Sequence, residues 1–414
     1  MKKCPVSSYC GGCQYQGMAY EKQLEEKQRR VEELLSCFCH VEKIIPCKES
    51  SHYRNKMQIS FGYDDKHHII CGYYIPESHM ILPIDECMIC DPLINKVYSS
   101  LKRIVISNRI PIYDERLNKG CLRHALIRSN KDGDVMLVLV TGSMNLVKKD
   151  LLIKQILHYN PEVKTIVHNI NHQRTSAILG NKNNVLFGKG YIVDQLFDLK
   201  FRISPASFYQ VNRHQTEVLY KTAVDLLELK DNESVIDAYC GTGTIGLYAS
   251  RNAFKVYGVE SNHSAVKDAD RNKKMNEIYN VDFICEDAGK YMEDLSKRKS
   301  HCDALTMDPP RAGSDKRFMS SAIKLSPDKI VYISCNPVTL KRDLSYLKRY
   351  YSIKKIIPVD MFPYTQHVES CVLLERVSNR KADSYVKLNE KMAEYYRIKD
   401  SAEADKCGGA EEDE

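Results

Sequence analysis

The chain of 414 residues contains no run of about 18 apolar residues, the length that a membrane-spanning helix requires. Its N-terminal sequence, MKKCPVSSYCGGCQYQ, also lacks an apolar stretch long enough for a signal peptide. No internal repeat is found, which argues against a solenoid or a propeller. We therefore expect a cytoplasmic protein that has no contact with a membrane.

Cysteine is abundant, with sixteen residues, but disulfide frameworks belong to short secreted chains. Here the cysteines are scattered through a long chain that has no export signal. Reduced thiols are therefore expected, some of them in a metal or cluster site and one of them in catalysis. The length and the hydrophobic content of 43% suit a soluble protein of two or three domains.

Positive charge exceeds negative charge, and the net charge is +7. Residues 400–414 hold seven acidic side chains and one lysine, so removing this tail and its charge of −6 leaves +13 on the body. A basic body favours a polyanionic partner, with nucleic acid first. Solubility alone is the competing explanation of this charge.

The sequence pattern divides the chain into four parts. Residues 1–90 contain a cysteine cluster, an amphipathic helix over residues 19–35 and short β-prone runs. Residues 91–201 form a central α/β region with a helix near 146–158, and residues 202–378 alternate strands with helices. Residues 379–414 are polar and helical at first and then acidic, and the last fifteen are expected to be disordered.

Residues 234–249, SVIDAYCGTGTIGLYA, are typical of a short strand, a glycine turn and a helix. Gly241 and Gly243 let the backbone turn sharply and approach a ligand. The next strand ends in Glu260, nineteen residues after Gly241, which is close to the spacing expected for an acid that binds ribose hydroxyls. Only two glycines precede the helix, so the pattern suits S-adenosylmethionine better than NAD. A tight turn without a ligand is the competing interpretation.

The three strands that follow also end in polar or reactive residues. Asp287 follows the third strand, where a contact to adenine is expected, Asp308 follows the fourth and Cys335 follows the fifth. In open α/β sheets the carboxyl ends of the strands form the ligand-binding edge. VYISCNPVTL alone suggests a small buried thiol at Cys335. The repetition at successive strand ends favours instead a nucleophile that faces a cofactor cleft.

Five motifs then match one family: SFYQVN, YCGTGTIGL, MDPPRAG, ISCNPVTLKRDL and MFPYTQHVES. Together and in this order they resemble the RNA uracil-5 methyltransferases that use S-adenosylmethionine. The resemblance runs from about residue 203 to 376 and extends to the N-terminus. It implies an α/β fold with a Rossmann-like class I methyltransferase domain and an N-terminal and central α/β domain that carries an iron–sulfur cluster.

The resemblance also implies the catalytic residues. Cys335 is the nucleophile that adds to carbon 6 of uracil, and Glu369 of HVES is the base that removes the proton from carbon 5. Nothing in the spacing pairs these residues, which are 34 positions apart, and Glu369 alone suggests a solvated acid. The positions expected to bind the cofactor are Gln210, Tyr239, Gly241, Gly243, Glu260, Asp287 and Asp308.

Cys4, Cys10 and Cys13 form a C-x5-C-G-G-C cluster, whose spacing differs from that of radical S-adenosylmethionine enzymes. Three clustered thiolates need a fourth ligand to complete a tetrahedral zinc site or a cubane cluster. Cys87 is the candidate and Cys90 is the close alternative, and the residues alone do not choose the metal. The resemblance implies a [4Fe-4S] cluster with Cys87 as fourth ligand, and a structural or RNA-contacting role, because methyl transfer needs no electron.

Many relatives carry a small β-barrel RNA-binding domain before the cysteine cluster, and we expect it to be missing here because Cys4 is the fourth residue. RNA contacts are therefore sought in HYRNKMQISFGY and CLRHALIRSN, where basic and aromatic side chains suit phosphate contact and base stacking. A basic sheet face and a loop salt bridge are the competing interpretations. The predicted RNA-binding residues are Tyr53, Arg54, Lys56, Arg123, Arg128 and Arg311, the last of which would orient the uracil or its backbone.

The expected reaction transfers a methyl group to carbon 5 of a uridine in 23S ribosomal RNA, through a covalent cysteine adduct on a flipped-out base. Ribosomal RNA is preferred because the family's transfer-RNA branch typically lacks these cysteines. The alternatives are transfer RNA and an iron–sulfur RNA-binding module without catalysis. An amino-group methyltransferase is disfavoured, because Arg311 follows the two prolines where that class has an aromatic residue. We expect a monomer, and no protein partner is implied.

Overall fold

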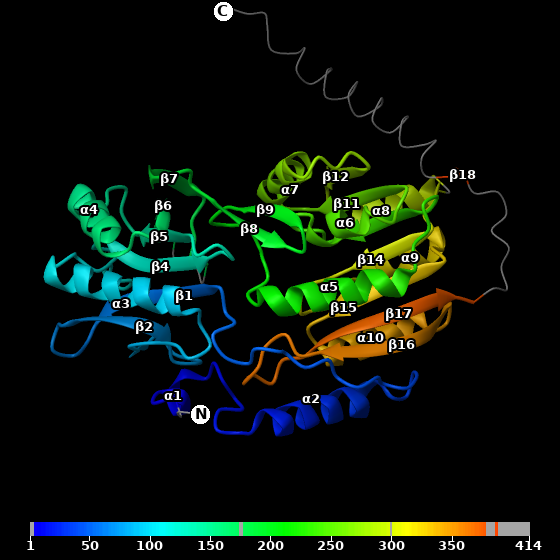
Figure 1. Ribbon diagram of the computed structural model, residues 1–414, viewed down its shortest axis with the longest axis horizontal. Helices are drawn as coiled ribbons and strands as arrows, with labels where there is room; N and C mark the ends of the chain where they lie inside the picture. The colour runs from blue at the N-terminus through cyan, green and yellow to red at the C-terminus, as the bar shows by residue number, and fades with distance from the viewer. Residues whose placement is uncertain (1–3, 174–176, 299, 378–385, 388–414) are drawn as a thin grey trace, which may run out of the picture.

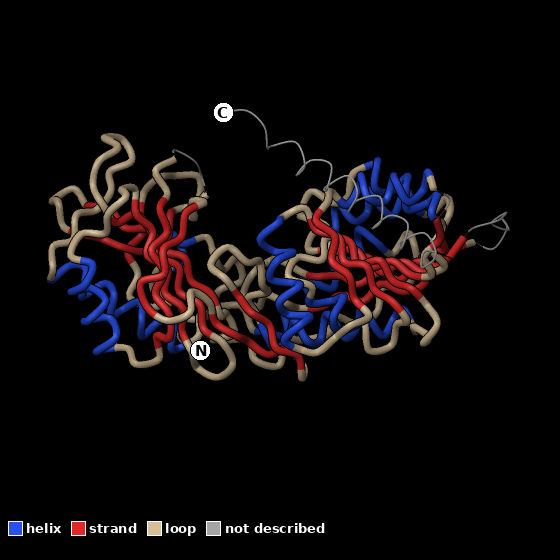
Figure 2. The backbone as a smooth tube through the Cα atoms, turned by 90° about the horizontal axis from the view of Figure 1, so that it is seen from above, coloured by secondary structure: helices blue, strands red, loops and turns tan. Residues whose placement is uncertain are grey.

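The computed structural model describes residues 4–173, 177–298, 300–377 and 386–387. Of the helix expected over residues 380–399, only residues 386–387 are described, and they form a short strand instead. The rest of that helix and the disorder expected for the last fifteen residues lie outside this range. Two seven-stranded sheets dominate the described chain and lie side by side, one in each lobe (Figure 1). The view from above in Figure 2 shows that helices flank both sheets.

The first sheet has the strand order β3-β2-β1-β4-β5-β6-β7 and is antiparallel except between β5 and β6. Its central strands, β4 and β5, are buried along their whole length because both faces of the sheet are covered. Helices α3 and α4 cover one of these faces. The bounds are β1 (Lys56–Tyr63), β2 (Ile69–Tyr74), β3 (Ile81–Pro83), β4 (Leu122–Ser129), β5 (Val135–Thr141), β6 (Val163–Ile170), β7 (Lys182–Phe187), α3 (Pro92–Ser107) and α4 (Lys149–Tyr159).

This sheet crosses the boundary that we expected after residue 90. Strand β1 pairs with β4 so that Ser60 lies opposite His124. Helix α3 begins directly after that boundary, where the Asp91 side chain accepts a hydrogen bond from the amide of Leu93 and Pro92 takes the first helical position. The cysteine region and the central region therefore share one sheet, joined by hydrogen bonds between distant segments that local composition does not reveal.

A hairpin of β8 (Ile192–Leu196) and β9 (Leu199–Ile203) lies between the two lobes (Figure 1). One hydrophobic cluster contains Leu126 of the first sheet, Phe201 of the hairpin and Leu219 of the second lobe. The second face of the first sheet is thus covered by the other lobe, and the two lobes share a core. None of the helices in the described ranges combines the length and the apolar character needed to cross a membrane.

The second sheet has the order β12-β11-β10-β14-β15-β17-β16, in which β17 alone runs antiparallel to the other six strands. Helices α5 and α6 pack on one face, and α8, α9 and α10 pack on the other. The bounds are β10 (Ser234–Ala238), β11 (Lys255–Glu260), β12 (Val281–Cys285), β14 (Ala304–Met307), β15 (Lys329–Ser334), β16 (Tyr351–Val359), β17 (Glu369–Arg376), α5 (Arg213–Leu227), α6 (Thr244–Ala249), α7 (His263–Met275), α8 (Ala288–Lys297), α9 (Lys316–Leu325) and α10 (Pro337–Leu347). The remaining elements are α1 (Ser7–Cys10), α2 (Tyr20–Leu35) and the short pair β13 (Ser300–His301) and β18 (Val386–Lys387).

Helix α2 forms where the sequence predicts a helix, but it packs on the second lobe rather than on the first. Its side chains Val31 and Leu35 are fully buried in the same cluster as α8, α9 and α10. Its buried positions follow the i, i+4 spacing of one helix face and include two polar residues, Gln23 and Lys27. The segment that follows continues this attachment, because Val41 and Ile45 form bridges to β16.

We predict that Val31→Ala lowers the free energy of unfolding of the second lobe by about 2 kcal/mol, because it leaves a cavity in a close-packed core. Glu25→Ala on the exposed side of the same helix serves as the control and should change it by less than about 0.5 kcal/mol. Urea unfolding followed by circular dichroism measures both. Equal stabilities of the two variants would show that α2 does not belong to this core.

Candidate active site

The carboxyl edge of the second sheet collects most of the residues that the sequence predicts for the site. Glu260 ends β11, and Tyr239, Asp308 and Cys335 directly follow β10, β14 and β15. These four strands are neighbours or near neighbours in one parallel arrangement, so their ends meet at the same edge. The strand ends that the sequence pattern singled out therefore come together at one edge of the fold.

Glu369 reaches the same edge from the opposite direction. It is the first residue of β17, which runs antiparallel between β15 and β16. The register places Ser334 opposite Ser370, so Cys335 and Glu369 lie next to each other at the strand ends. Cys335 is half-buried, whereas the exposed fraction of Glu369 is only 4%. The topology thus pairs a thiol and a carboxyl group that the sequence spacing could not pair.

Burial and neighbouring charge strongly shift the titration of these groups. The pKa of Glu369 is raised to about 8, mainly by burial and also by the charge of Asp308, while Arg311 acts in the opposite direction. Burial also raises the pKa of Cys335 to about 11, aided by Glu369 and Asp308 and opposed by Arg311. The four side chains therefore act on one another electrostatically. Both shifts favour the protonated forms of the thiol and the carboxyl group when no ligand is bound.

Arg311 connects three segments around this pair of residues. Its carbonyl oxygen accepts hydrogen bonds from Asn336 Nδ2 at 3.3 Å and from Thr339 Oγ1 at 3.2 Å, both on the segment after Cys335. Its exposed guanidinium lies 3.4 Å from the Nε2 atom of His367, two residues before Glu369. His367 was not predicted for the site, although it stands inside the quoted motif MFPYTQHVES.

The glycine turn has the backbone that its sequence predicts. Tyr239, Gly241 and Gly243 all have positive φ angles, of 63°, 55° and 82°. A Cβ atom on Gly243 would lie 2.4 Å from the ring of Phe283, whereas one on Gly241 would meet no atom within 4 Å. Glu260 Oε2 accepts a hydrogen bond from the amide of Gly241 at 3.2 Å. The turn is therefore packed beneath Gly243 and open at Gly241, where a ligand has room to approach.

Gln210 lies in the loop before α5, half-buried beside a residue that the sequence did not suggest. Burial raises the pKa of the Tyr220 phenol, as does the charge of Asp308, while hydrogen bonds with the side chains of Thr244 and Gln210 act in the opposite direction. Tyr220 therefore links the Gln210 loop, the turn after Gly243 and the end of β14. In the sequence it occupies an ordinary inward position of an amphipathic helix, which carries no functional signal.

Asp287 lies further out than the other predicted cofactor residues. Its carboxylate caps helix α8 by accepting a hydrogen bond from the amide of Lys290 at 2.9 Å, and it forms an ion pair with Arg317. The side chain is exposed.

Four cysteines border one cavity in the first lobe: Cys4, Cys10, Cys13 and Cys87. Burial and, to a smaller extent, the charges of the other three thiols together raise the pKa of Cys13 to about 12. Cys90 is fully buried in the core of the first lobe and does not border the cavity. Within the described residues, no three potential ligands converge closely enough to hold a single metal ion.

Three of the predicted RNA-binding side chains lie inside the protein, so in this structure they do not offer RNA the surface contacts that the sequence predicts. Arg123 is 4% exposed and forms an ion pair with Glu115, and Arg128 is 1% exposed between the two lobes. Tyr53 is buried and donates a hydrogen bond to the carbonyl oxygen of Pro363 at 3.1 Å. Arg123 and Arg128 are internal because β4 is covered on both faces by segments that are distant in the chain.

Arg54 and Lys56 are only half-buried, and Arg311 is exposed. Burial and the neighbouring charges of Arg128 and Arg54 together lower the pKa of Lys56 to about 7.

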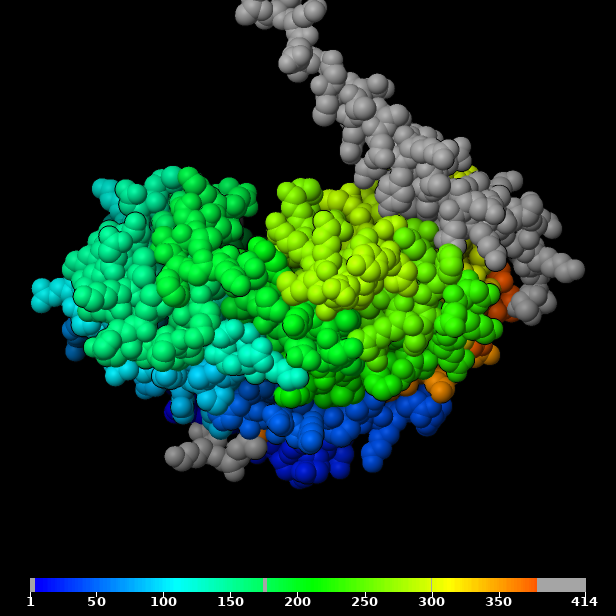
Figure 3. All heavy atoms as spheres, turned by 45° about the horizontal axis from the view of Figure 1, so that its top comes forward, coloured from blue at the N-terminus to red at the C-terminus, as the bar shows by residue number. Residues whose placement is uncertain are grey.

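In the space-filling view of Figure 3, a notch separates the teal and green surface of the first lobe from the yellow-green surface of the second.

The raised pKa of Glu369 predicts how stability depends on pH. The folded protein keeps this proton up to about pH 8, whereas the unfolded chain releases it near the ordinary pKa of 4.5, so stability falls as the pH rises between these values. Glu369→Gln cannot ionise and should be more stable than the wild type by about 1–3 kcal/mol at pH 8, with a smaller difference at pH 5. Urea unfolding at both pH values measures this. Glu375→Gln, at the half-exposed far end of β17, is the control. Its difference in stability from the wild type should not increase between pH 5 and pH 8. A difference for Glu369→Gln that stays constant with pH would contradict the shift.

Comparison with known proteins agrees with this architecture. Residues 159–377 match the family model described as tRNA (Uracil-5-)-methyltransferase. An uncharacterized RNA methyltransferase of Halalkalibacterium halodurans is 42% identical over 379 residues, which cover 90% of this chain and 82% of the relative. One of Clostridium tetani is 40% identical over 384 residues, covering 91% and 83%.

Among solved structures, the chain is similar to the Pyrococcus abyssi tRNA (uracil-54, C5)-methyltransferase in complex with S-adenosyl-L-homocysteine. The TM-score is 0.73 and the identity is 29%, and the match covers 88% of this chain and 85% of that one. These findings confirm the predicted family and its Rossmann-like α/β fold. The chain therefore belongs to the tRNA (uracil-5-)-methyltransferase family of RNA methyltransferases.

Proposed function

We propose that this RNA methyltransferase transfers the methyl group of S-adenosylmethionine to carbon 5 of a uridine in 23S ribosomal RNA, through a covalent adduct of Cys335 with carbon 6. The observation that carries this proposal is the adjacency of Cys335 and Glu369 at the edge of the sheet, beside the open glycine turn. Methylation of this carbon needs a nucleophile and a base on the same ring. Few other reactions would use both groups in this arrangement.

The proposed reaction has two halves, one for each residue of the pair. Cys335, as a thiolate, attacks carbon 6 of the uracil and turns the ring into an enolate, whose carbon 5 then takes the methyl group. Glu369 next removes the proton from carbon 5, and the electron pair of that bond restores the double bond to carbon 6 and expels the thiolate. Arg311 favours the thiolate of Cys335, which the attack requires, and the carboxylate of Glu369, which the removal of the proton requires.

The same edge offers a binding site for S-adenosylmethionine, which supplies an electrophilic methyl group. Glu260 is oriented by hydrogen bonds from the amides of Gly241 and of Asn262, the latter at 2.7 Å, which suits an acid that binds ribose hydroxyls. Asp308 is half-buried at the end of β14, which lies between β10 with its glycine turn and β15 with Cys335. We propose that Gln210, Tyr239, Gly243 and Asp287 complete this site, with Asp287 at its outer, exposed side.

We further propose that the cysteine cavity holds a [4Fe-4S] cluster. A single zinc ion needs four thiolates within about 2.3 Å of one point. Within the described residues, no three potential ligands are arranged to hold a single metal ion, although four thiols line one cavity. Four thiolates around one cavity are the ligand set of a [4Fe-4S] cluster, one for each iron atom. Because methyl transfer needs no electron, the proposed cluster has a structural or RNA-contacting role.

For the identity of the RNA substrate, a specific observation supports a second candidate. The cysteine cavity favours ribosomal RNA, because the transfer-RNA branch of the family typically lacks these cysteines. The solved structure with a TM-score of 0.73 is named as a tRNA (uracil-54, C5)-methyltransferase, which favours transfer RNA instead. Transfer RNA is therefore the second candidate, with the same chemistry and the same residues.

RNA fragments that carry 5-fluorouridine test the mechanism and the substrate together. Fluorine cannot leave as a proton does, so after methyl transfer the enzyme should remain bound to the RNA as a complex that is stable on a denaturing gel. Cys335→Ala should form no such complex. Cys285→Ala, which removes an exposed thiol from the end of β12 at the same edge, is the control and should form it normally.

The RNA that is trapped identifies the substrate, since fragments of 23S and transfer RNA can be compared side by side. Trapping of transfer RNA alone would replace the first candidate by the second. If neither RNA is trapped although the protein binds S-adenosylmethionine, the thiolate mechanism is wrong.

Iron analysis tests the cysteine site. Cys87→Ala should lose most of the bound iron and the absorbance of the cluster, because it removes a ligand from the cavity. Cys90→Ala removes a neighbouring thiol that does not border the cavity, and it should retain the iron of the wild type. Loss of iron in Cys90→Ala but not in Cys87→Ala would identify Cys90 as the fourth ligand. Zinc instead of iron in the purified wild type would overturn the proposed [4Fe-4S] cluster.

A further inference from the structure

The connection between β16 and β17 is a second determinant of where Glu369 lies. Residues 360–368 join the two strands, and the register pairs Val359 with Glu369, so the connection starts and ends beside the base. It also carries His367, which contacts Arg311. Any movement of this connection is therefore transmitted directly to the carboxyl group that the proposed reaction needs.

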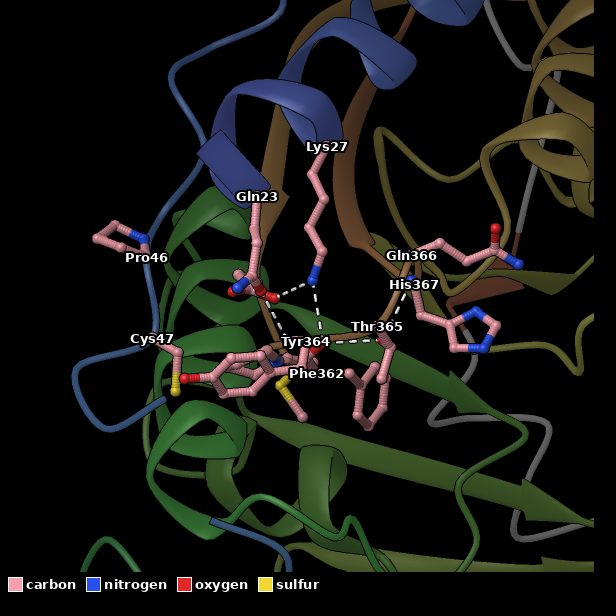
Figure 4. A network of polar contacts seen from close by, with 12 residues as sticks. Gln23, Lys27, Pro46, Cys47, Phe362, Tyr364, Thr365, Gln366 and His367 are labelled. Atoms are coloured by element: carbon pink, nitrogen blue, oxygen red, sulfur yellow. Dashed lines mark hydrogen bonds and ion pairs between the residues drawn. The ribbon is translucent and has the colours of Figure 1, made fainter. Parts of the chain in front are cut away.

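A buried ion pair anchors the first turn of this connection to helix α2. Lys27 Nζ lies 2.5 Å from Asp360 Oδ1 and donates a second hydrogen bond to the carbonyl oxygen of Phe362 at 3.0 Å. Both charged side chains are 0% exposed. The other carboxylate oxygen of Asp360 accepts a hydrogen bond from the Tyr20 hydroxyl at 2.7 Å. Figure 4 shows Lys27 reaching from the helix toward the chain at Phe362.

The rest of the connection is held by the same N-terminal segment at every second residue. The amide of Tyr364 donates to Gln23 Oε1 at 2.8 Å, and its carbonyl oxygen accepts from the amide of Tyr15 at 2.9 Å. The amide of Gln366 donates to Gln14 Oε1 at 3.3 Å, and its carbonyl oxygen accepts from Arg30 Nη1 at 3.1 Å. Lys27 is the buried charged member of this set and contacts the connection at two places.

Stability alone does not explain a buried lysine at this position. An ion pair that is fully removed from water contributes little net stability, and apolar residues of similar volume often do as well. The next two turns of the same buried face carry apolar residues, Val31 and Leu35, where α2 faces the core. Where α2 faces the connection, the buried positions are Gln23 and Lys27. The polar positions thus coincide with the segment that leads to Glu369.

We propose that Lys27 is a positioning residue for Glu369, acting through Asp360 and the carbonyl group of Phe362. It touches neither the substrate nor the cofactor, and it holds the connection so that the carboxylate meets the proton on carbon 5 of the methylated adduct. This inference rests on the proposed covalent mechanism. It concerns the second half of the reaction, in which Glu369 takes the proton, the double bond re-forms and Cys335 leaves. Cysteine attack and methyl transfer do not use Glu369 as a base.

The test measures the two halves separately in a single turnover. RNA with uridine tritiated at carbon 5 reports proton removal, and labelled S-adenosylmethionine reports methyl transfer. Lys27→Met removes the tether but leaves Asp360 as a buried unpaired charge, so the double variant Lys27→Met/Asp360→Asn is measured as well. Arg29→Met is the matched control, because it removes an ion-paired cation from the exposed face of the same helix.

In both Lys27 variants we expect tritium release to fall about tenfold or more relative to methyl transfer, since small misplacements of a reacting group cost this much. The methylated protein–RNA adduct should accumulate on a denaturing gel even with ordinary uridine. Arg29→Met should keep the ratio of the wild type. A merely structural role would reduce the amount of active protein and would lower both signals equally.

The outcomes separate this inference from the mechanism on which it rests. Wild type that methylates RNA without releasing tritium from carbon 5 would overturn the proposed reaction itself. Wild type that behaves as proposed, with both Lys27 variants keeping its ratio of tritium release to methyl transfer, would overturn the role of Lys27 alone.

Discussion

The direction of one strand determines the chemistry of this protein. In a fully parallel sheet, the start of every strand lies at the edge opposite the ligand. Strand β17 runs antiparallel between β15 and β16, so its first residue, Glu369, lies where the parallel strands end. This brings a carboxyl group beside Cys335 and also buries it, and burial is the main reason why the pKa of Glu369 rises. The pairing and the desolvation on which the proposed proton transfer depends both follow from this one topological feature.

The shared core of the two lobes accounts for the placement of most other residues. Because one hydrophobic cluster joins the first sheet, the β8–β9 hairpin and α5, side chains on β4 that resemble a basic surface are internal. The N-terminal segment crosses from the cysteine cavity to the second lobe, where α2 packs on the sheet and contacts the connection before Glu369. Tyr364 of that connection packs in a small cluster with Cys13 and Tyr53. The catalytic edge and the cysteine region are thus only a few contacts apart.

The fold class, the glycine turn and the strand-end positions of Glu260, Asp308 and Cys335 could be predicted from the sequence, because each depends on local pattern and on a general property of parallel sheets. Helix α2 was also predictable, although its buried face was not, since Gln23 and Lys27 are buried only through contacts with a segment more than 300 residues away. Motif resemblance suggested Glu369 as the base, but only the order and direction of the strands explain why it lies beside Cys335. Tyr220 and the burial of Arg128 depend on packing between distant segments, which no periodicity in a single sequence encodes.

The central claim is that Cys335 and Glu369 perform successive steps on the same ring. The most direct test is a rapid-quench single turnover of Glu369→Gln with RNA that carries the target uridine, in which methyl transfer and loss of the carbon 5 proton are followed together. We predict that the methyl group still enters the RNA, that the proton stays, and that the protein remains attached to the RNA through Cys335. Normal proton loss in this variant, or methyl transfer without any attached intermediate, would contradict the claim.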